Sequence, residues 1–261
     1  MSNDIDQHPS TFNRGRGNAP TPAGAVGPPD RTGASPRVLI LGAGGHGRVV
    51  LDILQQSGHY DVAGFLDNNV EIHGRRIDGV PVLGGIADVA RLAAEHDARS
   101  IVIAIGDNGV RRGLARSIRR LGLALVNAIH PSATIAASAT VGRNVVAAAG
   151  VVVCAHCQIG DSVILNTGCI IDHQTMVGEG AHICPGVRVA GRVKIESGAF
   201  LGIGSTVIPK VIIGCEAIVG AGAVVIGDVD AMSTVVGVPA RAVKRTQMDE
   251  DVAALILPGR A

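Results

Sequence analysis

The chain has 261 residues, enough for two modest domains, and a formal net charge of +1 at pH 7. This balance does not favour nucleic acid or an anionic membrane surface as a partner, and no apolar run approaches the ~20 residues of a membrane span. Residues 1–35 are rich in Pro, Gly, Asn and Asp and contain no apolar stretch. We therefore expect a disordered arm rather than a signal peptide, and a cytoplasmic protein.

Residues 36–128 have the pattern of a small α/β domain. The run 37–41 is continuously apolar, as in a buried parallel strand, and a helical apolar pattern follows it. The later elements follow in chain order as a strand at 61–66, a helix at 86–95, a strand at 100–105, a helix that begins at 106–108 and a last strand at 123–129. In the last of these helices Val110, Leu114 and Ile118 share one face. The alternation predicts a mostly parallel sheet of Rossmann type.

A glycine-rich turn lies between the first strand and the first helix. Gly42, Gly44 and Gly47 have the G-x-G-x-x-G spacing, and Asp67 directly follows the next expected strand, near where a ribose-binding acid would lie. The N-terminus of the helix would accept a diphosphate, which occurs in NAD and in nucleotide-linked sugars alike. Because no second domain for hydride transfer follows, we favour a nucleotide sugar over NAD. A purely structural turn is the third interpretation.

From Ile129 to Val236 the sequence repeats with a period of six, in eighteen hexapeptides without an insertion. The first position is Ile, Leu or Val in sixteen of them, Ala147 and Ala231 being the exceptions, and the fifth position is never larger than Val. A period held over this length is typical of a solenoid. Three hexapeptides would form one triangular coil of a β-helix with both positions facing inward, which predicts about six coils. The predicted boundaries are 1–35 for the arm, 36–128 for the Rossmann-like domain, 129–240 for the β-helix and 241–261 for a C-terminal tail with a short helix at 249–257.

Histidines of the β-helix are the candidate catalytic groups, because an imidazole accepts a proton near neutral pH. His173 is at the third position of its hexapeptide and should face outward. His182 follows half a coil later and should lie on another face. In a three-fold trimer such faces would meet in the cleft between subunits. His130 and His156 also face outward in this frame.

Five cysteines are present, an odd number that does not suggest a disulfide framework. Cys154, His156 and Cys157 have a spacing that suggests zinc, but Cys157 is at a fifth position and should point into the core, as should Cys169. We therefore interpret Cys157 and Cys169 as small buried hydrophobes and expect no metal site.

Several motifs between residue 37 and about residue 245 together resemble those of a known family. They are Gly42–Gly47 (GAGGHG), Phe65–Asp67 (FLD), Ala104–Asn108 (AIGDN), Asn127–Ala133 (NAIHPSA), Ile164–Thr167 (ILNT), Asp172–His173 (DH), Ala181–Gly186 (AHICPG), Phe200–Gly202 (FLG) and Val236–Ala240 (VGVPA). The family comprises left-handed β-helix acyltransferases with an N-terminal nucleotide-sugar domain. It includes the UDP-4-amino-sugar and GDP-perosamine N-acetyltransferases and the related sialic acid O-acetyltransferases.

The resemblance implies a left-handed parallel β-helix and three groups of site residues. His173 matches the general base, with Gln174 beside it and the polar Asn166 near the site. The residues implied to bind acetyl-CoA are His182, Gly191, Gly202, Ile203, Val238, Pro239, Ala240, Arg241 and Lys244. The residues implied to bind the nucleotide sugar are Gly44, Gly45, His46, Asp67, Asn68 and Gly106. Gln174 is a departure, since family members usually have Asp or Glu directly after the base. A glutamine orients the imidazole but does not stabilise its charged form.

The resemblance also implies an activity, an acetyl-CoA-dependent N-acetyltransferase. The acceptor would be the amino group of a UDP- or GDP-linked 4-amino-4,6-dideoxy sugar. We also expect a homotrimer, because a prism with one cofactor groove for each pair of subunits needs a neighbour. In direct transfer His173 would take the amine proton while the Gly191 N–H stabilises the oxyanion. Two alternatives stay open. An O-acetyltransferase of a sialic-acid-like sugar would use the same base and donor, and a non-catalytic β-helix scaffold would bind no acetyl-CoA.

Overall fold

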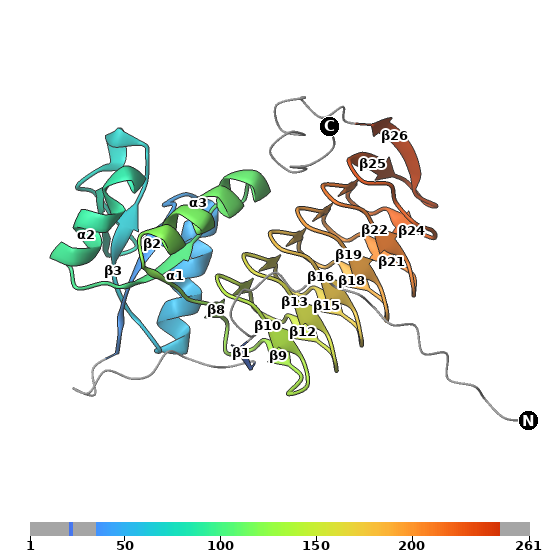
Figure 1. The fold of residues 1–261 in the computed structure, drawn as a ribbon, viewed down its shortest axis with the longest axis horizontal. Helices are drawn as coiled ribbons and strands as arrows, with labels where there is room; N and C mark the ends of the chain where they lie inside the picture. The colour runs from blue at the N-terminus through green and yellow to red at the C-terminus, as the bar shows by residue number, and fades with distance from the viewer. Residues whose placement is uncertain (1–20, 23–34, 246–261) are drawn as a thin grey trace, which may run out of the picture.

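The computed structural model describes residues 21–22 and 35–245 (Figure 1). An α/β domain is followed by a long prism of short strands. Within the arm expected at 1–35, β1 (Thr21–Pro22) pairs antiparallel with β10 (Thr140–Val141) at the first coil of the prism. The rest of that arm up to residue 34, and the helix expected at 249–257, lie outside the described residues. Within the described ranges, no helix is long and apolar enough to cross a membrane.

The N-terminal domain contains one six-stranded sheet. Its elements are β2 (Arg37–Leu41), α1 (Gly45–Ser57), β3 (Asp61–Leu66), η1 (Val70–Ile72), β4 (Arg76–Ile77), β5 (Val80–Gly84), η2 (Ile86–Asp88), α2 (Val89–Glu95), β6 (Ser100–Ile103), α3 (Asn108–Arg120) and β7 (Ala124–Leu125). The strand order is β4-β5-β3-β2-β6-β7, and all neighbours are parallel except β4 and β5. This order confirms the predicted Rossmann-type sheet, with β2 near its centre.

Helix α1 joins the two domains through a shared hydrophobic core. Its buried side chains Val50 and Leu54 belong to a cluster that also contains Val146 and Ile164 of the β-helix. Helices α2 and α3 cover the other face of the sheet. Burial of apolar surface stabilises a fold by about 25 cal/mol per Å². Because the shared cluster buries apolar side chains of both domains, it favours a fixed packing of the α/β domain on the prism.

Several boundaries of this domain differ from the sequence interpretation. The strand expected at 100–105 ends at Ile103, and the strand expected at 123–129 is divided into β7 and β8 (Ala128–Ile129). The hairpin of β4 and β5 has no counterpart among the expected elements. It turns at Asp78 and Gly79, which both have positive φ, as an Asp-Gly hairpin turn requires.

The buried face of α3 also differs from the expected one. Ile118 is buried as predicted, but Val110 is 51% exposed, whereas its neighbour Arg111 is completely buried. The physical reason is that carbonyl oxygens from both domains surround the Arg111 guanidinium. A helical pattern of apolar residues cannot reveal such a position.

The remaining described chain is a left-handed parallel β-helix in which each strand stacks on the strand one coil, or three hexapeptides, later in the chain. Its strands are β8 (Ala128–Ile129), β9 (Thr134–Ile135), β10 (Thr140–Val141), β11 (Val146–Ala147), β12 (Val152–Val153), β13 (Gln158–Ile159), β14 (Ile164–Leu165), β15 (Ile170–Ile171), β16 (Met176–Val177), β17 (His182–Ile183), β18 (Arg188–Val189), β19 (Lys194–Ile195), β20 (Phe200–Leu201), β21 (Thr206–Val207), β22 (Ile212–Ile213), β23 (Ile218–Val219), β24 (Val224–Val225), β25 (Ser233–Val236) and β26 (Arg241–Arg245).

These strands form the three faces of the prism. The first face contains β8, β11, β14, β17, β20, β23, β25 and β26, the second face β9, β12, β15, β18, β21 and β24, and the third face β1, β10, β13, β16, β19 and β22. We name the edges after the faces that they join. Residues 241–245, expected to begin the tail, instead form β26, which pairs antiparallel with β25.

The hexapeptide frame correctly predicts the interior of the prism. First-position side chains such as Ile171 and Ile183 are buried, and so are the fifth-position Cys157 and Cys169. Burial raises the pKa of the Cys169 thiol to about 12, so this thiol is neutral at physiological pH and behaves as a small hydrophobe.

The last coil departs from the expected frame. Val219 pairs with Val235 and Ile213 pairs with Val229, so these partners are closer in sequence than the three full hexapeptides that separate partners in the other coils. One corner is therefore two residues shorter, and the prediction of an uninterrupted frame is wrong in this coil. The irregularity explains Ala231, an exception at the first position, because Val229 and Val235 take the inward places and Ala231 is exposed.

Candidate functional site

The glycine-rich turn lies where ligands bind in sheets of this type. The carboxyl ends of β2, β3 and β6 meet there, at the point where the strand order reverses. Gly42 has a φ of 103°, and a Cβ on it would lie 2.8 Å from the Ala104 carbonyl oxygen, so only glycine fits. Helix α1 begins directly after Gly44, and the N–H groups of its first turn form a potential anion site.

Asp67 closes this turn by accepting two backbone hydrogen bonds. Its Oδ2 accepts from the N–H of Ala43 at 2.8 Å, and its Oδ1 accepts from the N–H of Asn69 at 2.8 Å. The carboxylate therefore fixes the turn at the end of β3, beside the pocket that it also lines.

A pocket of about 480 Å³ lies between the start of α1 and the β4–β5 hairpin. Gly44 and Asp67 line it, together with three arginines that the sequence interpretation missed, Arg48, Arg75 and Arg76. Guanidinium groups pair with phosphate oxygens, so this pocket suits a diphosphate. Arg75 and Arg76 lie at the unexpected hairpin, and only its pairing with β3 brings them beside the turn.

The other residues predicted to bind a nucleotide sugar do not all line this pocket. Gly45 is exposed in the first turn of α1. Asn68 supports the fold locally, since its Oδ1 accepts from the N–H of Ile86 at 3.2 Å. His46 and Gly106 lie instead at the boundary with the β-helix, beside His182.

Arg111 ties the loop at Gly106 to the β-helix. Its acceptors are the carbonyl oxygens of Ile105 (2.9 Å), Gly106 (3.0 Å), Asp107 (3.3 Å), Ser162 (2.8 Å) and Gly180 (2.8 Å) and the side-chain oxygen of Asn108 (2.8 Å). Burial, and next the charge of Arg112, lowers the pKa of Arg111 to about 10, so Arg111 is charged at neutral pH. On the same helix, Arg112 pairs with Glu216 and Arg119 pairs with Asp161 across the domain boundary.

His46 and His182 are partly buried and lie close to one another at this boundary. Burial, followed by the charge of Arg111, lowers the pKa of His46 to about 4. Burial, followed by the charges of Arg111 and His46, lowers the pKa of His182 to about 4, although the Gly106 carbonyl acts in the opposite direction. The His182 ring packs edge-on against Phe200, with centroids 5.2 Å apart. Among the described residues, neither His46 Nε2 nor His182 Nδ1 has a hydrogen-bond partner.

This histidine pair is expected to make the protein less stable below pH 6.5. Between pH 6.5 and 4 the unfolded imidazoles bind protons that the folded ones exclude, so the free energy of unfolding rises with pH. The contribution is complete above pH 6.5 and is lost as pH falls to about 4, by roughly 1–3 kcal/mol per imidazole. Urea unfolding at pH 7.5 and 5 should therefore show a smaller pH effect in His46→Asn than in wild type. The exposed His59→Asn serves as control, and an equal pH effect in both variants contradicts the assignment.

His173 lies on the second–third edge, exposed between β15 and β16. Its backbone N–H donates to Asp172 Oδ1 at 2.6 Å, and its Nδ1 is 3.3 Å from Gln174 Oε1. Gly191 lies one coil above, where an added Cβ would be 2.5 Å from His173 Nε2. A histidine whose Nδ1–H donates to an amide oxygen keeps a lone pair at Nε2, as a general base requires.

Substitution of Gly191 by alanine is expected to lower kcat about 100-fold without unfolding the protein. Gly191 does not have positive φ, so alanine suits the backbone, but the new Cβ would displace the imidazole by about 1 Å or more. Steady-state kinetics and thermal unfolding measure the two effects. Gly113→Ala on α3, where nothing lies within 4 Å of the added Cβ, is the control. An unchanged kcat in Gly191→Ala would mean that catalysis does not require the His173 imidazole to lie against residue 191.

The residues implied to bind acetyl-CoA are divided between two edges of one protomer. Those on or near the first–second edge are Gly202, the 58% exposed Ile203, the 74% exposed Val238, Pro239 and Ala240. Asn166, which was expected near the catalytic base, also lies on this edge and not on the edge of His173. Gly191 lies with His173 on the second–third edge instead. Asn166 Nδ2 is 3.5 Å from Nε2 of His182 on the first face. Arg241 donates to the Ala240 carbonyl at 2.8 Å, and Lys244 pairs with Thr234 in the β25–β26 ladder.

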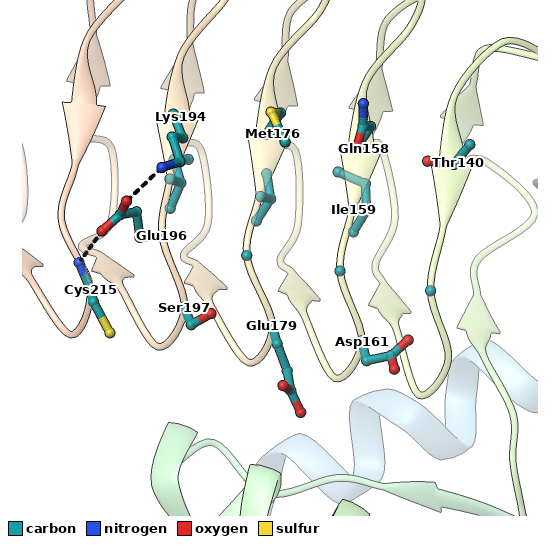
Figure 2. A pocket seen from close by; sticks show the side chains of 15 residues that line it. Thr140, Gln158, Ile159, Asp161, Met176, Glu179, Lys194, Glu196, Ser197 and Cys215 are labelled. Atoms are coloured by element: carbon teal, nitrogen blue, oxygen red, sulfur yellow. Dashed lines mark hydrogen bonds and ion pairs between the residues drawn. The ribbon is translucent and has the colours of Figure 1, made fainter. Parts of the chain in front are cut away.

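A second hollow, of about 530 Å³, lies on the third face beside the third–first edge (Figure 2). Gln158, Met176 and Lys194 line it from successive strands. Lys194 Nζ pairs with Glu196 Oε1 at 2.7 Å, and Glu196 Oε2 accepts from the N–H of Cys215 at 3.1 Å. None of the residues selected from the sequence lines this hollow, so it is separate from the candidate site.

No group of three or more His, Cys, Asp or Glu side chains that would hold a metal ion occurs in the part of the chain that the structure describes. At the Cys154–Cys157 segment, the Cys157 side chain is completely buried and its Sγ donates to the Asp172 carbonyl oxygen at 3.0 Å.

Comparison with known proteins matches both halves of this arrangement. The family model of the PglD N-terminal domain matches residues 37–118. The structure of PerB from Caulobacter crescentus, in complex with CoA and GDP-perosamine, is 40% identical, covers 81% of this chain and 99% of its own, and superimposes with a TM-score of 0.76. This chain belongs to the left-handed β-helix sugar N-acetyltransferases with a PglD-type N-terminal domain.

Two further relatives support the membership in this N-acetyltransferase family. The acetyltransferase domain of PglB from Neisseria gonorrhoeae, in complex with acetyl coenzyme A, is 33% identical over 80% of this chain and 100% of its own, with a TM-score of 0.76. UDP-N-acetylbacillosamine N-acetyltransferase from Bacillus subtilis is 34% identical over 115 residues. That match spans 42% of this chain and half of the length of the curated relative.

Proposed function

We propose that this protein transfers the acetyl group of acetyl-CoA to the amino group of a nucleotide-linked 4-amino-4,6-dideoxy sugar. The observation that carries the proposal is that one chain holds both an arginine-lined pocket at the α1 N-terminus and the outward His173 with its Nε2 lone pair. The structure of the relative PerB contains CoA and GDP-perosamine, and the match with this chain covers 99% of PerB. Two structures of the perosamine N-acetyltransferase from Caulobacter crescentus, with one histidine replaced by asparagine or alanine, contain the same two molecules.

In this proposal the pocket at the α1 N-terminus binds the diphosphate of the nucleotide sugar. The N–H groups after Gly44 and the guanidinium groups of Arg48, Arg75 and Arg76 supply positive charge there. His46 and Gly106, farther toward the β-helix, would then lie near the sugar rather than near the nucleotide.

The chemistry is direct transfer without an acyl-enzyme. The sugar amine attacks the thioester carbonyl, a carbon–nitrogen bond forms, and the carbon–sulfur bond to CoA breaks. His173 Nε2 takes the amine proton and passes it to the departing CoA thiolate. The backbone N–H of Gly191 stabilises the oxyanion of the tetrahedral intermediate. Much of the rate would come from holding the two substrates together.

The protein is proposed to act as a homotrimer, because one protomer separates the parts of the site. His173 and Gly191 lie on the second–third edge, whereas Asn166 and Ile203 lie on the first–second edge. A three-fold arrangement of parallel prisms places these two edges of neighbouring copies in one cleft. Acetyl-CoA would bind in this cleft, with Arg241 and Lys244 at the end where its nucleotide lies. A cytoplasmic location, where acetyl-CoA is available, is part of the same proposal.

A substrate panel tests the proposal. The wild-type protein is mixed with acetyl-CoA and with UDP- and GDP-linked sugars that carry either an amino or a hydroxyl group at C4. Release of the CoA thiol and the mass of the product report transfer. Turnover of an amino sugar is the expected result. Turnover of hydroxylated sugars alone would instead indicate an O-acetyltransferase. Absence of both turnover and acetyl-CoA binding would indicate a scaffold.

A further inference from the structure

The second–third edge carries a ladder of polar side chains that includes the neighbour of His173. His156, Gln174, Arg192 and Lys210 follow one another at intervals of one coil, each at the fourth position of its hexapeptide. All four have positive φ, between 59° and 65°. Backbone hydrogen bonds between coils, such as that from Arg192 N–H to the His173 carbonyl at 2.9 Å, fix the stacking. Each side chain in the ladder is therefore next to the side chain one coil away.

Arg192 determines which way the Gln174 amide faces. Arg192 Nε donates to Gln174 Oε1 at 3.0 Å. A guanidinium has no acceptor, so the amide atom that it contacts must be the oxygen. The same oxygen is 3.3 Å from Nδ1 of His173, so this Nδ1 must carry the proton. The lone pair is thereby placed at Nε2, on the side of Gly191.

The other charged groups around His173 do not perform this task. The Asp172 carboxylate accepts the backbone N–H of His173 at 2.6 Å, and, after burial, its charge raises the pKa of the Cys154 thiol. His156 lies one coil below Gln174, and Lys210 lies one coil above Arg192. Among the described residues, Gln174 is the only one whose side chain hydrogen-bonds to the imidazole. Orientation of the base therefore depends on a neutral amide.

We infer that Arg192 is a positioning residue, which acts through Gln174 to keep the His173 base in the Nδ1–H form and in its reactive orientation. The inference rests on the proposed function, in which His173 Nε2 accepts the amine proton. The C=O and NH₂ groups of a glutamine amide have similar shapes, so the amide can turn over. Without a cation that binds its oxygen, the NH₂ group can face Nδ1. The imidazole would then place its lone pair at Nδ1 and its proton at Nε2, where no proton can be accepted.

Kinetics of matched variants test this role. Arg192→Met is expected to lower kcat about 10-fold, with the KM of both substrates changed less than about twofold. Lys210→Met, which removes the same charge one coil farther from Gln174, is the control and should keep kcat within about twofold. In the Arg192→Met background, Gln174→Glu should restore most of kcat, because a carboxylate accepts the Nδ1–H whichever way it turns. The acid limb of kcat/KM should also move to higher pH, since the carboxylate stabilises the imidazolium.

Other outcomes would overturn the inference. If Arg192→Met behaves as Lys210→Met does, Arg192 does not position the base. If only the KM of acetyl-CoA rises, Arg192 binds the donor instead. Wild-type turnover tests the proposed function separately from these ratios. The rate at which His173 is carbethoxylated, measured by mass spectrometry, tests the inference without any enzymatic turnover. This rate at neutral pH should change at least about threefold in Arg192→Met and less in Lys210→Met, and equal rates would again contradict the inference.

Discussion

Replacement of His173 by alanine is expected to lower kcat for acetyl transfer about 100- to 10,000-fold, the usual contribution of a positioned general base. The side chain is exposed on an edge of the prism and makes one side-chain hydrogen bond, to Gln174 at 3.3 Å. Its loss should therefore leave the free energy of unfolding within about 0.5 kcal/mol of wild type. The KM values should change little, because the imidazole acts on the transferred proton rather than on the bound substrates. Steady-state kinetics on the active amino sugar measure the loss.

His156→Asn is the matched control for this experiment. His156 lies on the same edge one coil below, is also exposed, and has positive φ that asparagine tolerates. It should keep kcat within about twofold of wild type. If His173→Ala retains most of the activity, the base lies elsewhere. The neutral His182, with its pKa of about 4, would then be the group to replace next.

The interior of the β-helix could be predicted from the sequence because a single rule governs it. In the regular coils the first- and fifth-position side chains meet the same narrow core, so Ile171, Ile183 and Cys169 are buried for one reason. The rule does not predict a change in corner length. The corner before Val229 is two residues shorter than the others. Only the pairing of Val229 with Ile213 shows that Val229, and not Ala231, takes the inward first position in this coil.

The hexapeptide frame predicts the positions of the histidines within the β-helix but not their contacts with the other domain. It correctly predicts that His173 faces outward and that His182 lies on another face, since both follow from the period of six. It does not bring His46 beside His182, because these residues are far apart in the sequence and meet only through the packing of α1 on the β-helix. The resemblance assigned them to different ligands, and the structure places them at one domain boundary.

The arginines were missed for two physical reasons. Arg75 and Arg76 precede an Asp-Gly turn, and that dipeptide is a known hairpin signal that would have brought them beside the nucleotide turn. Arg111 had no such signal. Its burial depends on carbonyl oxygens of Ser162 and Gly180, which follow it by 51 and 69 residues and belong to the other domain.

Substitution of Arg111 by methionine is expected to lower the free energy of unfolding by at least about 3 kcal/mol. Methionine fills much of the volume but donates no hydrogen bond, so buried carbonyl oxygens on both sides of the domain boundary lose their donor. Arg116→Met on the exposed side of the same helix controls for the change in charge and helix propensity, and should cost less than about 0.5 kcal/mol. Urea unfolding of the two variants at pH 7.5 measures the difference.

The same substitution separates a role in folding from a role in the site. Arg111 also holds the carbonyl oxygens of Ile105 and Gly106, so its loss releases the loop that lies beside His182. At a temperature where Arg111→Met is still folded, the KM for the nucleotide sugar should rise, because Gly106 in this loop is proposed to lie near the sugar. If Arg111→Met instead unfolds as Arg116→Met does, the boundary must be held by the shared hydrophobic core and the ion pairs of Arg112 and Arg119. In that case the buried guanidinium would serve the orientation of the loop alone.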